Sequence, residues 1–182
     1  MSYAKIGTPA PHFSLPILDP SEPDNAGKIR SLSDYKGSWL AFFFYPADFS
    51  LLCPTEILGF SDRKQEFDEI GCQILGCSTD TYFTHKAWLG TSREKNGIAG
   101  TTFPLAADHS GETARAYGVL IEGKHLAHRG LFLIDPAGVL RYSVITELHI
   151  GRSTDETLRV VQALQTGGVC PSDWRPGKPT LG

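Results

Sequence analysis

The chain has 182 residues, the length of one globular domain, and 41% of them are hydrophobic while 20% are charged. This composition excludes a disordered chain and supports a substantial buried core without disulfides. The formal net charge of −3 gives no global electrostatic attraction to nucleic acid or to an anionic membrane. The longest apolar run, Trp39 to Tyr45 (WLAFFFY), is far too short for a transmembrane helix.

The first residues and the cysteines indicate a compartment. The segment Met1 to Lys5 (MSYAK) lacks the apolar centre of a secretory signal, which predicts a cytoplasmic protein. Four cysteines are too few for a disulfide scaffold in a chain of this length. We therefore expect thiols that are either reactive or simply buried.

Apolar runs alternate with helical patterns over the first two thirds of the chain. Strands are expected at residues 39–45, 72–77 and 103–107, and helices at residues 53–70, 83–95 and 111–117. A hairpin at residues 131–145 follows, and then a helix that begins with a capping box at Ser153. This order of elements predicts an α/β fold, with a mixed central sheet in a three-layer domain.

The last residues show no periodicity and contain three prolines between Val169 and Gly182. Proline-rich, aperiodic sequence is typical of an extended arm and not of a core element. We therefore expect a domain at residues 1–165 and a C-terminal arm at residues 166–182.

Cys53 is the residue with the clearest chemical signal. It follows a buried strand and a loop, and it stands where a helix is expected to begin, next to Pro54. The free N–H groups and the positive dipole at a helix start favour a thiolate, the nucleophilic form of the side chain. The alternative is a buried cysteine that packs as a small apolar residue.

The sequence around Cys53 resembles the P-x-x-x-[TS]-x-x-C motif of peroxiredoxins, in the stretch Pro46 to Cys53 (PADFSLLC). Further segments resemble the typical 2-Cys group, which includes the peroxidase component of alkyl hydroperoxide reductase, and they follow the family's order along nearly the whole chain. They are FFYPADF at 43–49, CPTE at 53–56, STD at 78–80, RGLFLIDP at 129–136, GRSTDET at 151–157 and VCPxxW at 169–174. The resemblance implies a thioredoxin-like three-layer α/β/α fold, a mixed sheet, and no cofactor or metal.

The resemblance also implies roles for residues near Cys53, which matches the peroxidatic cysteine that a peroxide oxidises to a sulfenic acid. Arg129 matches the arginine that stabilises the thiolate and binds the peroxide oxygens. Ser50 stands where threonine is more usual and keeps the hydroxyl for the peroxide. Pro46 matches the proline that shields the thiolate from water. Taken alone, Arg129 fits a surface arginine and Pro46 a turn proline.

Three more residues match positions around this group. Glu56 and Arg152 match residues that orient the active-site arginine, and Trp88 matches a tryptophan that packs near the pocket. As isolated residues, Glu56 and Arg152 are typical solvated surface charges, whereas Trp88 fits a core aromatic equally well.

Cys170, in the arm, matches the resolving cysteine. The resemblance implies a disulfide between Cys53 and Cys170 of two subunits in a head-to-tail homodimer, with a pentamer of dimers as the larger assembly. The separation in sequence alone permits pairing within a chain or between chains. A thioredoxin-like protein or a flavoprotein disulfide reductase would reduce this disulfide. The first helical turn at Cys53 should unwind in each cycle so that the two thiols can meet.

Cys72 and Cys77 stand at the two ends of an expected buried strand. Five positions apart, they should face opposite sides of the sheet and act as core or spare thiols. No pair of nearby histidines completes a zinc site with them, so we expect no metal there.

Two segments depart from the family. Hyperoxidation-sensitive members carry a Gly-Gly-Leu-Gly segment and a C-terminal Tyr-Phe helix, whereas this sequence has Asn96 to Ala99 (NGIA) and ends in Leu181-Gly182. We therefore expect resistance to sulfinic acid formation, because nothing braces the folded active site. The stretch before the second cysteine, residues 165–169, is also shorter than in many members, which leaves the reach of the arm open.

The leading prediction is a thiol peroxidase that reduces hydrogen peroxide and organic hydroperoxides in antioxidant defence and redox homeostasis. The alternative, from another functional class, is a redox-controlled holdase chaperone or peroxide sensor. A cysteine hydrolase would need a positioned base, and none of the six histidines stands in a recognisable partner motif.

Overall fold

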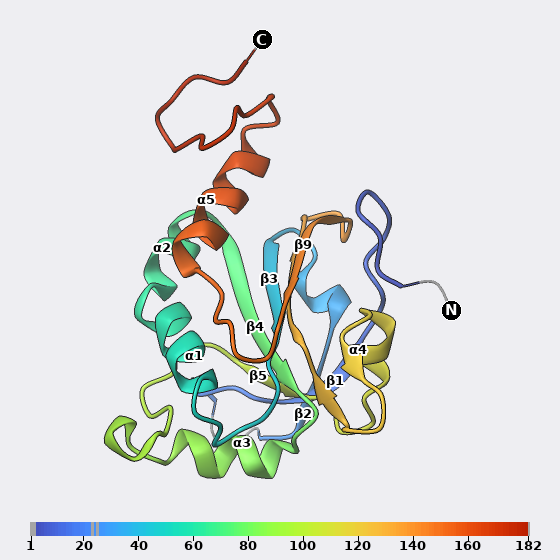
Figure 1. Ribbon diagram of the computed structural model, residues 1–182, viewed down its shortest axis with the longest axis vertical. Helices are drawn as coiled ribbons and strands as arrows, with labels where there is room; N and C mark the ends of the chain where they lie inside the picture. Colours follow the sequence, from blue (N-terminus) through green and yellow to red (C-terminus); the bar gives the residue numbers. More distant parts are fainter. Residues whose placement is uncertain (1–2, 23, 25, 182) are drawn as a thin grey trace.

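A seven-stranded sheet forms the centre of the computed structural model, which describes residues 3–22, 24 and 26–181 (Figure 1). Residues 1 and 2, at the start of the expected domain, and residue 182, at the end of the expected arm, lie outside the described residues. The strands follow the order β2-β1-β5-β4-β3-β8-β9, and β6 and β7 form a separate pair. Their bounds are β1 Ser14–Leu18, β2 Lys28–Ser31, β3 Trp39–Phe44, β4 Cys72–Ser78, β5 Leu105–Ala107, β6 Leu120–Ile121, β7 Leu126–Ala127, β8 Arg129–Ile134 and β9 Leu140–Thr146.

The sheet is mixed, as the sequence predicts. Strand β4 runs parallel to β3 and β5, whereas β8 is antiparallel to both β3 and β9. The short pair β6–β7 was not predicted, because two-residue strands leave no periodic signal.

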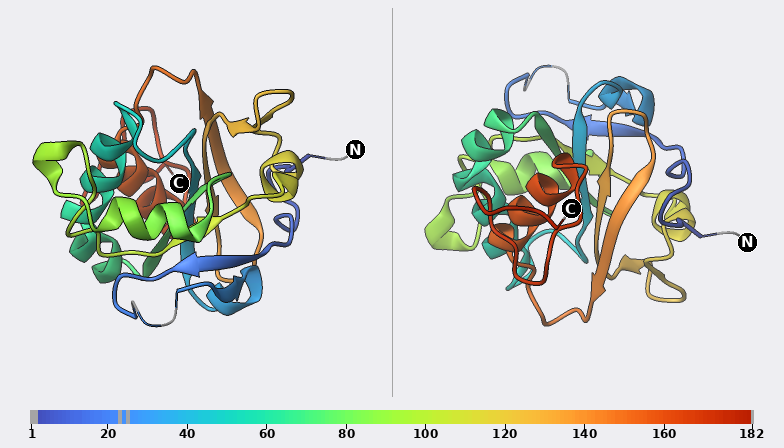
Figure 2. Two further views of the ribbon diagram at one scale, coloured as in Figure 1. Left: turned by 90° about the horizontal axis from the view of Figure 1, so that it is seen from below. Right: turned by 90° about the horizontal axis from the view of Figure 1, so that it is seen from above.

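Helices cover both faces of the sheet and complete the predicted three-layer α/β architecture. In Figure 2, α1, α2, α3 and α5 (teal, green and red) lie to one side of the strands, and α4 (yellow) lies to the other. Their bounds are α1 Cys53–Asp62, α2 Lys64–Glu69, α3 Tyr82–Leu89, α4 Glu112–Ala116 and α5 Thr154–Gln165, with short 3-10 helices η2 Leu32–Tyr35 and η3 Arg93–Lys95.

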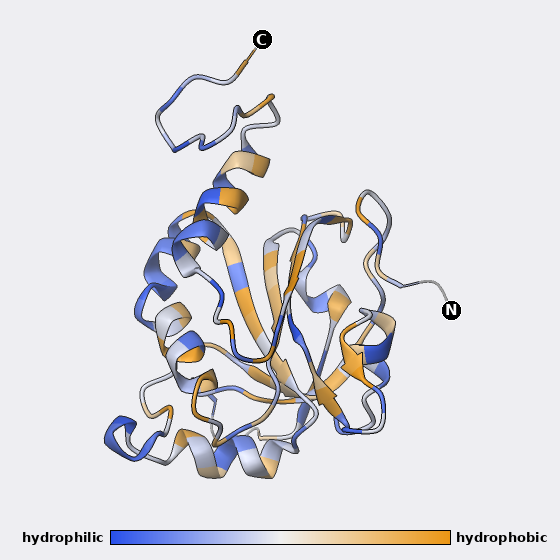
Figure 3. Cartoon of the chain, viewed as in Figure 1, coloured by the Kyte–Doolittle hydropathy of each residue, from blue (hydrophilic) through white to orange (hydrophobic). Residues whose placement is uncertain are grey.

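Strand β3 carries side chains into two separate hydrophobic clusters. Phe42 and Phe44 belong to the cluster on the α4 side, whereas Phe43 belongs to the cluster under α1 and α2. On that second face the ring of Phe43 stacks on Phe60 of α1, with centroids 4.8 Å apart. Because both faces of the strand are buried, its sequence is apolar throughout and not alternating, as the hydropathy colouring of Figure 3 shows.

Cys72 and Cys77 lie on opposite faces of the sheet, one in each hydrophobic cluster, which confirms the prediction from their spacing. Burial raises the pKa of the Cys72 thiol to about 12 and raises the pKa of Cys77 well above its ordinary value. Both side chains therefore stay protonated at neutral pH and behave as apolar core residues.

Two helix predictions were wrong in their lengths. The helix expected over residues 53–70 breaks at Arg63, where φ is −110° and ψ is 13°. The Arg63 guanidinium forms ion pairs with Glu66 and with Asp155 of α5. The contact with Asp155 joins positions far apart in the chain, so the local sequence does not reveal the break. The helix expected over residues 83–95 ends at Gly90 and resumes only as η3.

The arm, residues 166–181, folds back beside α5 (Figure 1). Its one element of pairing is a bridge between Val169 and Leu181. Trp174 anchors it: the side chain is buried, and its carbonyl oxygen accepts a hydrogen bond of 3.1 Å from Arg159 of α5. Among the residues that the structure describes, no helix is both long and apolar enough to cross a membrane.

We expect Phe132→Ala to lower the free energy of unfolding by about 3–5 kcal/mol, because it leaves a cavity in the aromatic cluster. The Phe132 ring lies 4.8 Å from the centroid of Tyr117 and 5.9 Å from that of Phe44. Urea denaturation measures this change. The exposed Ile29 gives the control Ile29→Ala, and equal stability losses in the two variants would contradict the packing described here.

Candidate active site

Cys53 is the first residue of α1, as predicted. Strand β3 ends at Phe44, a loop of eight residues follows, and α1 begins with Cys53 and Pro54. The Cys53 side chain is fully buried. The sulfur is therefore shielded from solvent at the positive end of the α1 dipole.

Arg129 lies beside this sulfur although 76 residues separate the two positions in sequence. Its Nη1 donates to Cys53 Sγ over 3.4 Å, and its Nε donates to the Leu148 carbonyl oxygen over 2.7 Å. The pairing of β8 with β3 brings Arg129, the first residue of β8, to the end of the sheet at which β3 leads into the Cys53 loop. The fold thus brings together the two residues with the most important expected roles.

Glu56 and Arg152 fix the other side of Arg129. Glu56 Oε2 accepts hydrogen bonds from Arg129 Nη1 and, over 3.0 Å, from Arg152 Nη2. Arg152 Nε donates to Glu56 Oε1 over 2.7 Å, and Arg152 Nη1 donates to the carbonyl oxygens of Phe44 and Gly130. The three charged side chains are at most 3% exposed, so none of them is the solvated surface charge that each would suggest in isolation.

The charges of this group do not balance among themselves. Two buried guanidinium groups face one carboxylate, which leaves one positive charge in a region of low dielectric constant. Burial disfavours the ionised form of Glu56, but the hydrogen bonds and charges of Arg152 and Arg129 outweigh it and hold the pKa of this carboxyl below its ordinary value. Glu56 is therefore ionised at neutral pH. A thiolate at Cys53 would neutralise the remaining charge.

A hollow of about 510 Å³ leads from the surface to Arg129. Apolar side chains dominate its walls, and the residues that line it are Pro46, Ser50, Leu51, Leu52, Arg129, Leu148 and His149. The Ser50 hydroxyl donates to the Ala47 carbonyl oxygen over 2.9 Å, so its oxygen remains an acceptor on the wall. No sequence pattern indicated Leu148 and His149, which lie in the loop after β9.

The other two expected residues lie outside this group. Trp88 is fully buried behind the loop that precedes Cys53, with its ring centroid 5.9 Å from Phe49. Cys170 lies in the arm, where its sulfur is 3.6 Å from the Ala163 carbonyl oxygen of α5. All four cysteines of the chain are unpaired in the structure.

A second buried polar group lies under the same loop and was missed by the sequence analysis. Asp48 accepts from the Tyr45 hydroxyl over 2.8 Å, and its other oxygen is 2.7 Å from His85 Nδ1. His85 Nε2 faces the Ala106 carbonyl oxygen at 3.2 Å. Burial raises the pKa of Asp48, against the opposing effect of His85. These contacts join the loop before Cys53 to α3 and β5. Because the three residues lie far apart in the sequence, no local pattern predicts that they meet.

Comparisons with known proteins show the family of this chain. Residues 6–143 match the AhpC/TSA family. The chain is 47% identical to a putative peroxiredoxin, YkuU, of Bacillus subtilis, over the full length of both, and 47% identical to peroxiredoxin-1 of Gallus gallus, over 98% of this chain and 90% of the relative.

Solved structures show the same fold. A reduced 2-Cys peroxiredoxin of Plasmodium vivax superposes with a TM-score of 0.91 at 32% identity, over 99% of this chain and 93% of the other. The AhpC of Enterococcus faecalis superposes with a TM-score of 0.83 at 32% identity, over 92% of this chain and 99% of the other.

The fold and these comparisons thus define a thiol-dependent peroxidase with a thioredoxin-like α/β domain. The chain belongs to the AhpC/TSA family and is a peroxiredoxin.

We expect Glu56→Gln to destabilise the protein by about 3–5 kcal/mol at pH 7, because two buried guanidinium groups lose their counter-charge. The pKa of Glu56 is lowered from 4.5 in the folded state. Its contribution to stability is therefore complete above about pH 4.5 and is lost as the pH falls through the lower folded value.

Denaturant unfolding of both proteins between pH 7 and pH 3.5 measures this difference, and the exposed Glu147 supplies the control Glu147→Gln. A wild-type advantage over Glu56→Gln that stays constant across this range would contradict the assigned charge.

Proposed function

We propose that this peroxiredoxin reduces hydrogen peroxide and organic hydroperoxides at Cys53. One observation carries the proposal: Arg129 Nη1 lies 3.4 Å from the Cys53 sulfur, in a buried group with one uncompensated positive charge. A thiolate at this position completes the charge balance and is the nucleophile that peroxide reduction needs.

In the first step the Cys53 thiolate attacks one peroxide oxygen. A sulfur–oxygen bond forms as the O–O bond breaks, and the leaving oxygen takes up a proton to become water or an alcohol. Cys53 is left as a sulfenic acid. Arg129 stabilises the negative charge that develops on the peroxide oxygens. The Ser50 oxygen on the wall of the hollow accepts a hydrogen bond from the peroxide, and Pro46 and Leu52 keep water away.

In the second step the Cys170 thiol of another subunit attacks the Cys53 sulfenic acid, which gives a disulfide and releases water. Two observations support pairing between chains. Cys170 contacts α5. In Figure 1 the arm lies at one end of the domain, and the start of α1, where Cys53 stands, lies towards the other end. Cys53 is fully buried, so the first turn of α1 must unwind before the disulfide forms.

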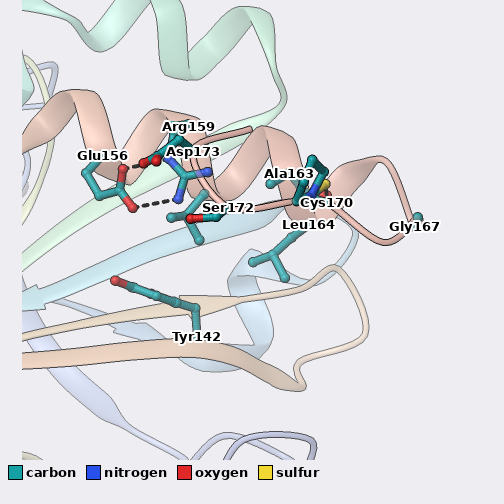
Figure 4. Close-up of a pocket in the computed structure, with 12 residues that line it drawn as sticks. Tyr142, Glu156, Arg159, Ala163, Leu164, Gly167, Cys170, Ser172 and Asp173 are labelled. Carbon is teal, nitrogen blue, oxygen red and sulfur yellow. Dashed lines mark hydrogen bonds and ion pairs between the residues drawn. The ribbon is translucent and has the colours of Figure 1, made fainter. Parts of the chain in front are cut away.

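The edge of the sheet supports a homodimer. Strand β9 stands at one end of the strand order, and on its outer side, among the described residues, only Leu140 bonds to backbone, at Gly7 and Thr8. An open edge strand is a template for pairing with another chain. Beside this edge a hollow of about 630 Å³ lies between Tyr142 of β9, helix α5 and Cys170 of the arm (Figure 4). The hollow offers space in which the unwound Cys53 segment of a partner can reach Cys170.

The family resemblance supplies the remaining features of this proposal. A thioredoxin-like protein or a flavoprotein disulfide reductase regenerates the thiols, and dimers associate further as a pentamer of dimers. The exposed rings of Phe49 and Phe83, 49% and 67% exposed, offer apolar surface for such a second interface. Four free thiols fit a reducing compartment, so we place the protein in the cytoplasm, in antioxidant defence.

After one equivalent of hydrogen peroxide, non-reducing electrophoresis should show a covalent dimer for the wild type and for Cys72→Ala. Neither Cys53→Ser nor Cys170→Ser alone should give this band. A mixture of the two variants, exchanged before oxidation, should restore it, because Cys53 of one chain meets Cys170 of the other. A disulfide within each chain, seen without any dimer in the mixture, would contradict pairing between subunits.

Cys53→Ser should abolish peroxide consumption with a dithiol reductant, whereas Cys170→Ser, given one equivalent of peroxide without reductant, should still consume it. A holdase chaperone, the alternative function, would protect an aggregating client equally well in Cys53→Ser. Turnover that survives in Cys53→Ser would refute the peroxidase mechanism.

A further inference from the structure

His149 lines the hollow that leads to Arg129, and the proposed mechanism gives it no role. Burial orders the lining of this hollow by depth. Arg129, at its base, is buried. Leu52 and Leu148 are half-buried along its wall. Leu51 and His149 are exposed at its rim. A molecule that fills the hollow therefore meets a guanidinium at the inner end, apolar walls, and an imidazole at the outer end.

The backbone around His149 is held in place beside the active-site arginine. His149 lies in a turn that the Ile150 N–H closes by donating to the Glu147 carbonyl oxygen over 3.1 Å. The carbonyl oxygen of Leu148, which belongs to the peptide bond that precedes His149, accepts from Arg129 Nε over 2.7 Å. The turn that presents the imidazole is thus tied directly to the guanidinium at the base of the hollow.

The His149 side chain is free to bind a ligand. Its imidazole is exposed, and no described residue forms a hydrogen bond or an ion pair with it. An imidazole donates a hydrogen bond in its neutral and its protonated form, and it is positively charged when protonated. Glu147, the acidic side chain of the same turn, does not line the hollow. A carboxylate, which accepts hydrogen bonds and attracts a positive charge, is therefore the organic group that this rim fits best.

The hollow is also much larger than hydrogen peroxide. Its volume is about 510 Å³, whereas one water molecule takes up about 30 Å³ in the liquid, and hydrogen peroxide has only one more oxygen atom. The remaining space is bounded by three leucines, Leu51, Leu52 and Leu148. An apolar organic group can fill this space and remove its surface and that of the leucines from water.

We propose that His149 is a specificity-determining residue that binds the carboxylate of organic hydroperoxides in which an apolar spacer separates that carboxylate from the peroxide group. This inference rests on the proposed function. The peroxide lies at Arg129 and Cys53, the spacer on the leucines, and the carboxylate at His149. The Cys53 thiolate bonds to the terminal peroxide oxygen as the O–O bond breaks. The oxygen on carbon keeps the bonding electron pair and takes up a proton, which gives a hydroxy acid and Cys53 sulfenic acid.

The test uses hydrogen peroxide, cumene hydroperoxide with a para-carboxylate, and the methyl ester of that compound, at about pH 6. Rapid quenching and mass spectrometry measure the rate at which each oxidises reduced Cys53. The ratio of the two organic rates cancels the reactivity of the thiolate. In the wild type the carboxylate should react about fivefold faster than the ester at low ionic strength, the size of an exposed ion pair. This preference should shrink at about 1 M salt.

Variants of His149 separate its charge from its packing. His149→Gln removes the charge and should bring the ratio to about one, whereas His149→Lys keeps a positive charge and should retain the preference. His12→Gln, at an exposed position outside the hollow, is the matched control and should keep the wild-type ratio. A merely structural effect of His149→Gln would lower the rates with all three peroxides by one factor and leave the ratio unchanged.

A wild-type ratio of one, or a preference that persists in His149→Gln, would overturn the assignment of His149. Failure of the proposed function looks different, because no peroxide would then oxidise Cys53 in any of these proteins. Binding decides the role of His149 in that case as well. The alcohol that corresponds to the para-carboxylate probe should shift the His149 ring resonances in NMR spectra, and its methyl ester should not. No shift, or an equal shift with the ester, would count against a carboxylate site.

Discussion

Two guanidinium groups, one carboxylate and one sulfur share a buried space at one end of the sheet, and the arrangement of the rest of the chain serves to keep them there. An unpaired charge is expensive to bury, so each partner must hold the others in position. Glu56 binds both arginines, and the carbonyl oxygens of Phe44, Gly130 and Leu148 accept further hydrogen bonds from them. The guanidinium of Arg129 also faces the sulfur of Cys53.

The fold supplies this arrangement through its strand order. Strand β3 leads into the loop that carries Ser50 and Cys53, and its neighbour β8 begins with Arg129. The loop after β9 returns to provide Leu148 and Arg152. Since β3 is covered on both faces, the two hydrophobic clusters fix its position. The loops that follow β3 and β9 then place Cys53 and Arg152 beside Arg129.

The central strand, the start of α1 and the mixed sheet could be predicted from sequence, because each has a local cause: an unbroken apolar run, a proline in the first turn, alternating elements. The break at Arg63 could not, since its ion pair with Asp155 joins residues far apart in the chain. The same holds for the contact between Asp48 and His85. Arg129 was found only through resemblance to a family, because no local pattern distinguishes it from a surface arginine.

The proposed mechanism requires this site to be both rigid and able to open. The buried charges favour one folded arrangement, in which Cys53 has no exposed surface. Local opening of the first turn of α1 reconciles these demands, since it exposes Cys53 and leaves the strands of the sheet in place.

The most direct measurement of the central claim is the second-order rate constant for oxidation of reduced Cys53 by hydrogen peroxide in Arg129→Ala. Loss of a donor aimed at the developing charge lowers such rates by about 10²-fold or more. We predict a fall of that size, with an unchanged rate in the surface control Arg115→Ala. A rate for Arg129→Ala within twofold of the wild type would contradict the role assigned to this guanidinium.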